Sequence, residues 1–132
     1  MDIHTLYEEF LALDKKIELL LEESGYMSAE GMLDISMDRH NPNEGLLYEE
    51  FASMLSHLAY IHSVLGYLQK PVIQEGVIRI NKRGNYEING MELKHQEPFE
   101  ILVHDEYADM YRWYLTEKSE ADLNGKRARI RG

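Results

Sequence analysis

The stretch that decides the fold runs from residue 65 to residue 80 and reads LGYLQKPVIQEGVIRI. Up to Gln69 it continues a pattern in which apolar residues recur every three or four positions, as in an α-helix. Pro71 disfavours helical geometry at the residue before it, so we expect the helix to end there. Residues 77–80 then read as a β-strand. The change of period predicts two domains, residues 1–70 and residues 71–132.

Upstream of Pro71, the period predicts a second helix over residues 44–69. Its apolar seam, spaced alternately by four and three residues, is Leu47, Phe51, Met54, Leu58, Ile61, Leu65 and Leu68. Small residues form another row at the same spacing: Ala52, Ser56, Ala59, Ser63 and Gly66. Small side chains permit the close approach of another backbone. This row predicts either burial within the monomer or the seam of a homodimer.

A first helix is expected from Asp2, which can cap its start, to Gly25, which can end it. Its seam residues are Ile3, Leu6, Phe10, Leu13, Ile17 and Leu20. Further leucines lie off this seam, so the apolar face is wider than the contact between two helices requires. The two helices predict an antiparallel hairpin with a long connecting segment, in which residues 28–33 are a plausible short helix.

Residues 51–69 contain no Asp, Glu, Lys or Arg, which approaches the length of a membrane span. They include two His, three Ser, two Tyr and one Gln, and a bilayer segment rarely carries so many polar groups. The first residues lack a basic region followed by an apolar run, so no secretory signal is visible. We therefore expect a cytoplasmic protein with no membrane partner.

After Pro71, short segments of alternating character predict six strands. They are residues 77–80, 86–88, 91–94, 99–103, 111–116 and 127–130, with Asn89-Gly90 and Asn124-Gly125 as tight turns. Closely spaced short strands are typical of a small antiparallel β barrel or a curled sheet. The fold class predicted for the chain is therefore α+β.

The order of turn and core residues over residues 74–131 resembles a family of small uncharacterised β domains, a domain of unknown function. The residues that carry the resemblance include Tyr86-Glu87-Ile88, Pro98-Phe99-Glu100-Ile101-Leu102, Trp113-Tyr114-Leu115, Leu123-Asn124-Gly125 and Arg127-Ala128-Arg129-Ile130. This family is common on phages and mobile elements of Gram-positive bacteria. The resemblance implies a small β fold and a mobile-element setting, and it implies no reaction.

Charge is unevenly placed along the chain. Of the formal net charge of −10, residues 1–70 hold 13 acidic and 4 basic side chains, a balance of −9. Residues 71–132 hold 11 acidic and 10 basic side chains, a balance of −1. The acidity therefore belongs to the predicted hairpin, and the end of the chain is basic.

Motifs that carry chemistry are weak. The chain has no cysteine, which excludes disulfides and thiolate ligands, and it has no His-Glu-x-x-His sequence. His57 and His62 are five residues apart, which places them about 140° apart on a helix. Adjacent glutamates diverge by about 100° and cannot form a close acid–base pair. We therefore expect no enzyme, no metal site and no cofactor.

Two surfaces are candidates for binding instead. Carboxylates on rigid helices can face a basic surface of a nucleic-acid-handling protein, and the candidates are Glu8, Glu9, Glu22, Glu23, Glu49 and Glu50. Solubility is the plainer explanation of this charge. A basic and aromatic face could bind single-stranded nucleic acid, with candidates Arg79, Lys82, Arg83, Arg112, Trp113, Lys126, Arg127, Arg129 and Arg131. A strand edge protected by charge is its plainer explanation.

The sequence thus favours a non-enzymatic interaction protein from a phage or mobile element. We expect an inhibitor or modulator, anti-CRISPR-like or otherwise anti-defence, that contacts a host nucleic-acid-handling protein such as a nuclease. The alternative is a nucleic-acid-binding accessory factor that uses the basic face of the C-terminal domain. A homodimer is possible in either case.

Overall fold

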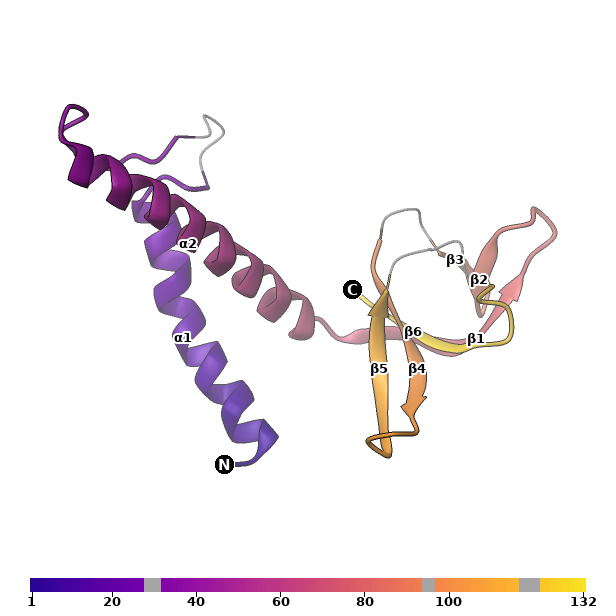
Figure 1. The fold of residues 1–132 in the computed structure, drawn as a ribbon. Coiled ribbons are helices and arrows are strands. Elements are labelled where there is room, and N and C mark those ends of the chain that lie inside the picture. Colours follow the sequence, from indigo (N-terminus) through magenta and orange to yellow (C-terminus); the bar gives the residue numbers. More distant parts are fainter. Residues whose placement is uncertain (28–31, 94–96, 117–121) are drawn as a thin grey trace. The chain divides into compact units, whose positions relative to one another are not determined.

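The computed structural model describes residues 1–27, 32–93, 97–116 and 122–132. The chain divides into two compact units, residues 1–69 and residues 70–132, and each is described by itself. The first unit is a pair of helices and the second is a six-stranded antiparallel sheet, which confirms the α+β fold class (Figure 1).

Helix α1 (Ile3–Glu23) begins where its capping residue predicts. A side-chain oxygen of Asp2 accepts a hydrogen bond from the backbone N–H of Thr5 at 2.8 Å, which satisfies one of the free donors at the helix start. This bond favours the charged carboxylate and so lowers the pKa of Asp2 below its ordinary value of 3.8. At the other end, Ser24 caps the helix and Gly25 follows with a positive φ of 75°.

The segment after α1 turns back onto the hairpin. The backbone N–H of Asp34 donates to the carbonyl of Ser24 at 2.7 Å, which brings two parts of the segment together. A Cβ atom at Gly25 would lie 2.8 Å from Asp34, so this crossing requires glycine. Leu33 then packs on the core of the hairpin. The short helix expected over residues 28–33 includes residues 28–31, which lie outside the described residues.

Helix α2 (Pro42–Leu68) starts two residues before its predicted start at residue 44 and ends one residue before its predicted end at residue 69. Asn41 caps its start, because its side chain accepts a hydrogen bond from the N–H of Asn43 at 2.9 Å. The core of the hairpin is centred on Ile17 and Leu21 of α1 and Leu55 of α2.

Most of the predicted seam residues are not in this core. The buried seam residues are Ile17 of α1 and Leu65 of α2, whereas Leu21 and Leu55, which lie off the two seams, are also buried. Of the remaining seam residues, Ile3 is largely exposed and the others are half-exposed or partly buried. The reason is that α1 and α2 diverge, so that the start of α1 lies apart from the end of α2 (Figure 1).

The sheet unit contains six strands, at positions close to those predicted. They are β1 (Val72–Ile80), β2 (Tyr86–Ile88), β3 (Met91–Glu92), β4 (Phe99–Asp105), β5 (Met110–Thr116) and β6 (Arg127–Arg131). β1 starts five residues earlier than predicted, because residues 72–76 pair with β6. The strand order is β3-β2-β1-β6-β4-β5, and every pair of neighbours is antiparallel.

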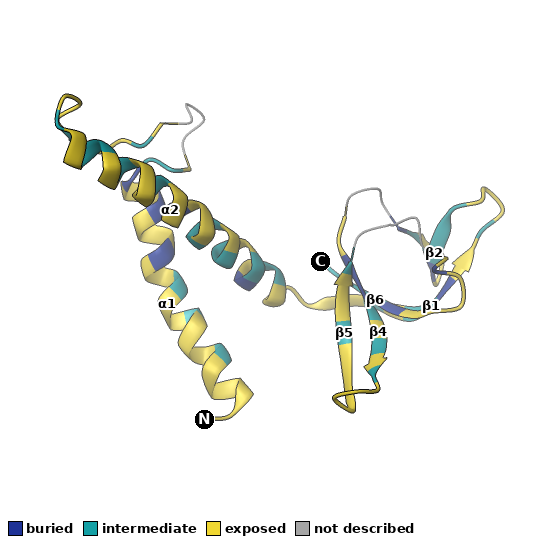
Figure 2. Cartoon of the chain, in the orientation of Figure 1, coloured by how far each residue is buried: buried dark blue, intermediate teal, exposed yellow. Residues whose placement is uncertain are grey.

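The sheet is open, since β3 and β5 stand at the two ends of the strand order. Of the two forms predicted, the curled sheet is therefore the one observed. Its core lies on one face, where Ile78, Ile88, Phe99 and Ala128 are buried together with Leu93 and Leu123 from the loops. Figure 2 shows where the buried residues of each unit lie, and few of them are in the hairpin.

Candidate functional site

The six glutamates proposed for partner binding are all exposed, on α1 and α2. Glu22 and Glu23 follow Glu8 and Glu9 by fourteen residues, close to four helical turns, so the two pairs share one side of α1. None of the six forms an ion pair with another described residue. Their charge is therefore available to solvent or to a partner.

One histidine–carboxylate pair joins the two helices within the described hairpin. The Nδ1 atom of His62 lies 2.9 Å from Oδ1 of Asp14, and both side chains are largely covered. Whether the ring nitrogen donates depends on its tautomer, but the pair ties α1 to α2 where they are in contact. The sequence pattern does not reveal this partner of His62, since the two residues are 48 positions apart.

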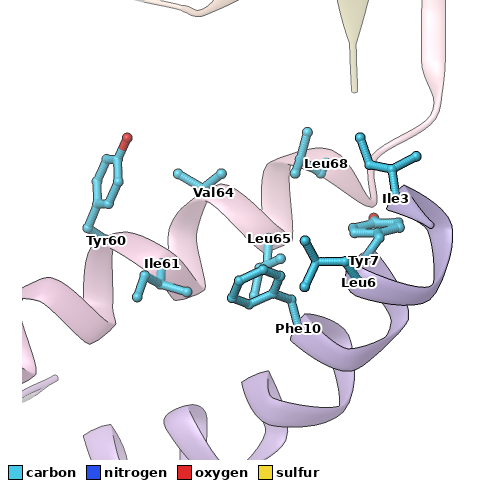
Figure 3. A pocket seen from close by; sticks show the side chains of 9 residues that line it. All are labelled: Ile3, Leu6, Tyr7, Phe10, Tyr60, Ile61, Val64, Leu65 and Leu68. Atoms are coloured by element: carbon cyan, nitrogen blue, oxygen red, sulfur yellow. The ribbon is translucent and has the colours of Figure 1, made fainter. Parts of the chain in front are cut away.

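An apolar groove lies where the helices diverge (Figure 3). It has a volume of about 370 Å³ and is lined by Ile3, Leu6, Tyr7, Phe10, Tyr60, Ile61, Val64, Leu65 and Leu68. A second hollow of about 380 Å³ is lined by Leu20, Ser24, Leu33, Ile35, Phe51, Met54, Leu55 and Leu58. These hollows were not predicted, although the excess width of the apolar faces was a signal of them.

The row of small residues on α2 contacts the hairpin core through Ala59. Ala52 and Ala59 are partly buried, whereas Ser56, Ser63 and Gly66 are exposed. A Cβ atom at Gly66 would have no neighbour within 4 Å. The hairpin by itself therefore does not bury the whole row, and burial within the monomer and a homodimer seam both stay predictions.

In the sheet unit, the arginines of β6 converge on a buried carboxylate. Glu100 is 4% exposed and lies opposite Arg129 in the register of β4 and β6. Arg129 donates from Nε and Nη2 to Oε1 of Glu100 at 3.0 and 2.7 Å, and Arg131 donates from Nε to Oε2 at 2.8 Å. Much of the expected positive charge of this strand is therefore neutralised inside the unit.

Trp113 belongs to the same cluster. The guanidinium carbon of Arg129 lies 4.4 Å from the centre of the Trp113 ring, a cation–π contact. The ring is therefore covered on one side by an arginine that is already paired with Glu100. Neither group is presented as an open platform for a nucleic-acid base.

The other basic candidates are spread over the sheet unit. Arg112 comes directly before Trp113 on β5, so its side chain lies on the opposite face of the sheet from the Trp113 ring. There its guanidinium carbon lies 5.6 Å from the centre of the Tyr114 ring. Lys82 and Arg83 are exposed in the turn after β1, with Arg83 3.7 Å from Glu92. Arg127 lies 3.9 Å from Glu75, and Arg79 and Lys126 are exposed. The nine candidates do not form one patch.

The structure gives little that points to metal or membrane binding. No three His, Cys, Asp or Glu side chains of the described residues are placed to hold a metal ion. His104 pairs with Asp109 at 3.1 Å and stacks on Tyr111, and His95 lies outside the described residues. Within the described parts of the chain, neither helix has the length and apolar character of a membrane span.

Comparisons with known proteins identify no relative, because no family model, no curated protein and no solved structure matches the chain. The resemblance of residues 74–131 to a mobile-element domain family stays a prediction. What the chain does must therefore be argued from its own surfaces.

Proposed function

We propose that the chain is a non-enzymatic interaction protein that inhibits or modulates a host nucleic-acid-handling protein. The partner presents a basic surface, such as the nucleic-acid channel of a defence nuclease, and the exposed glutamates of the hairpin contact it. A phage or a mobile element is the setting that the sequence resemblance implies.

One observation supports this proposal over the nucleic-acid-binding alternative. The acidic candidates are exposed and unpaired among the described residues, whereas the arginines of β6 already share Glu100. The charge that remains for a partner is therefore negative, and it is held on helices rather than on loops. Fixed carboxylates favour fast association with a basic protein and a complex that weakens with salt.

The experiment is capture of the partner from a host lysate, followed by affinity measurement with charge-reversed variants. Single changes Glu8→Lys, Glu22→Lys and Glu49→Lys should each weaken binding about two- to tenfold, because each removes an attraction and adds a repulsion of similar size. The dissociation constant of the complex should also rise with salt concentration. Titration with duplex DNA should displace the partner if its nucleic-acid surface is the one occupied.

The matched control is Glu106→Lys, which makes the same change of charge at an exposed residue of the sheet unit. It should leave the affinity within about twofold of the wild type, as exposed charges away from a contact contribute little. Equal effects of Glu22→Lys and Glu106→Lys would show that net charge alone matters. A dissociation constant that changes neither with the charge reversals nor with salt concentration would overturn the acidic interface.

A further inference from the structure

The hairpin has two heptad-spaced apolar rows that its own helices do not cover. On α1, Leu6, Leu13 and Leu20 follow one another at seven residues and are 43, 49 and 48% exposed. On α2, Leu47, Met54 and Leu68 lie in one register of seven and are 49, 54 and 40% exposed. Residues seven apart lie on one side of a helix. The α1 row is therefore half-exposed along its length, and the α2 row is half-exposed on both sides of Ile61, which is partly buried against the hairpin core.

The two rows lie on the same side of the hairpin. Leu6 and Leu68 both line the groove between the diverging ends, as Figure 3 shows. Leu20 and Met54 both line the second hollow. The rows and the two hollows therefore form one face, which we call the heptad face, made of apolar side chains with Tyr7 and Tyr60 at one end.

The chain as a whole exposes more surface than two compact units of its mass would, and the excess is of the size that a dimer buries. The chain exposes 10077 Å², whereas two separate compact units of half its mass would expose about 8,700 Å². The excess, about 1,400 Å², exceeds the roughly 800 Å² that each partner contributes to a standard interface. Among its described residues, the hairpin buries four apolar side chains and exposes sixteen large ones.

We infer that the heptad face is covered by the same face of a second copy of this chain, so that two hairpins form a four-helix bundle. Heptad rows pack against rows of the same spacing, and a second copy supplies both of them about a two-fold axis. The residues that line the two hollows carry no charge, so they do not match the basic partner proposed for the glutamates. The inference does not rest on that proposed function.

The small-residue row of α2 is outside this interface. Ser56 and Ser63 follow Met54 and Ile61 by two residues, about 200° around the helix. A homodimer seam on the small residues and one on the heptad face are therefore distinguishable by mutation. Glu9 follows Leu6, and Glu50 follows Leu47, by three residues, so these two exposed glutamates lie beside the rows, and two copies bring like charges together.

The test is sedimentation equilibrium of the full chain over a range of concentrations, with far-UV circular dichroism to confirm folding. The wild type should be a dimer. The double change Leu13→Gln with Met54→Gln should raise its dissociation constant at least about tenfold, because each change occurs twice in the symmetric interface. Salt should strengthen the dimer by screening the like charges, the opposite of its effect on an acidic–basic complex.

The matched control is Leu19→Gln, which changes the same residue type on the same helix at 52% exposure but away from the heptad face. It should leave the dissociation constant within about twofold. A wild type that stays monomeric at all concentrations would overturn the inference. So would a dimer that Ser56→Gln with Ser63→Gln disrupts while Leu13→Gln with Met54→Gln does not.

Discussion

Glu100 shows how one buried carboxylate can pair with the arginines of a basic strand. It is the one charged residue that the described part of the chain buries, and two arginines of β6 donate to its two oxygens. A buried charge without partners is costly, so the position of Glu100 depends on both guanidinium groups. The cluster holds β4 against β6, and its role is structural within the unit.

We predict that Glu100→Gln destabilises the sheet unit by about 3 kcal/mol, because it leaves two arginines facing a neutral amide. The measurement is urea unfolding followed by the fluorescence of Trp113, the single tryptophan, whose ring contacts Arg129. The same variant should move the emission spectrum of the folded protein, since the contact with Arg129 is disturbed.

Glu75→Gln is the matched control for this prediction. Glu75 is also opposite Arg129 in the register, but it is exposed and its ion pair with Arg127 is 3.9 Å long. Its replacement should cost less than about 0.5 kcal/mol. Equal losses of unfolding free energy for the two variants would mean that buried Glu100 stabilises the unit no more than exposed Glu75 does.

At the scale of elements, the sequence predicts what depends on neighbours along the chain. The helix caps at Asp2 and Gly25 and the tight turn at Asn89-Gly90, with φ of 50° and 86°, lie where local geometry requires them. The six strands also follow from the alternation of side chains. Their order does not, since β6 inserts between β1 and β4 through contacts far apart in sequence.

The candidate surfaces are less predictable for the same reason. The pattern of the helices shows that wide faces are apolar, but it does not show where the two helices touch. Periodicity therefore predicted seams that place Ile17 in the core but leave most of their other residues beside it. Likewise, Glu100 reads as an ordinary polar position of a strand, because its partners lie 29 and 31 residues away.

The divergence of α1 and α2 leads to a prediction that separates the core of the hairpin from the predicted seam. Leu21→Ala removes a side chain that is 1% exposed and should cost about 3 kcal/mol. Leu13→Ala removes a seam residue that is 49% exposed and should cost about 1 kcal/mol or less. Thermal or urea unfolding followed at 222 nm, where helix dominates, measures both.

Low protein concentration keeps the second measurement on the monomer, since Leu13 also lies on the heptad face. A loss for Leu13→Ala as large as that for Leu21→Ala under these conditions would restore the predicted seam as the contact between the helices. A difference of about 2 kcal/mol is well outside the error of such comparisons.

At the scale of the whole molecule, the charges of the two units differ in kind. The negative charge of the hairpin includes exposed glutamates. In the near-neutral sheet unit, part of the positive charge is paired with Glu100 inside the unit. A strongly negative hairpin attached to the sheet repels phosphate groups at low salt, when screening is weakest. These effects act together against the nucleic-acid-binding alternative.

We therefore predict that the full chain does not shift short single- or double-stranded DNA or RNA in a gel at low salt. If a shift is seen and is lost in Lys82→Ala with Arg83→Ala, the exposed turn after β1 binds nucleic acid and the prediction is wrong. Glu106→Gln is a suitable companion variant, because it changes an exposed charge of the same unit in the direction that would strengthen any such binding.

The first and last residues of the sheet unit meet at one place. The carbonyl of Pro71 accepts a hydrogen bond from the N–H of Gly132 at 3.0 Å, and the carbonyl of Lys70 accepts one from Arg131 at 2.8 Å. A unit whose ends are adjacent can be inserted into a surface loop of another protein, or circularly permuted, with little strain at the joints. Residues 70–132 thus have adjacent ends, the geometry that insertion into another protein requires.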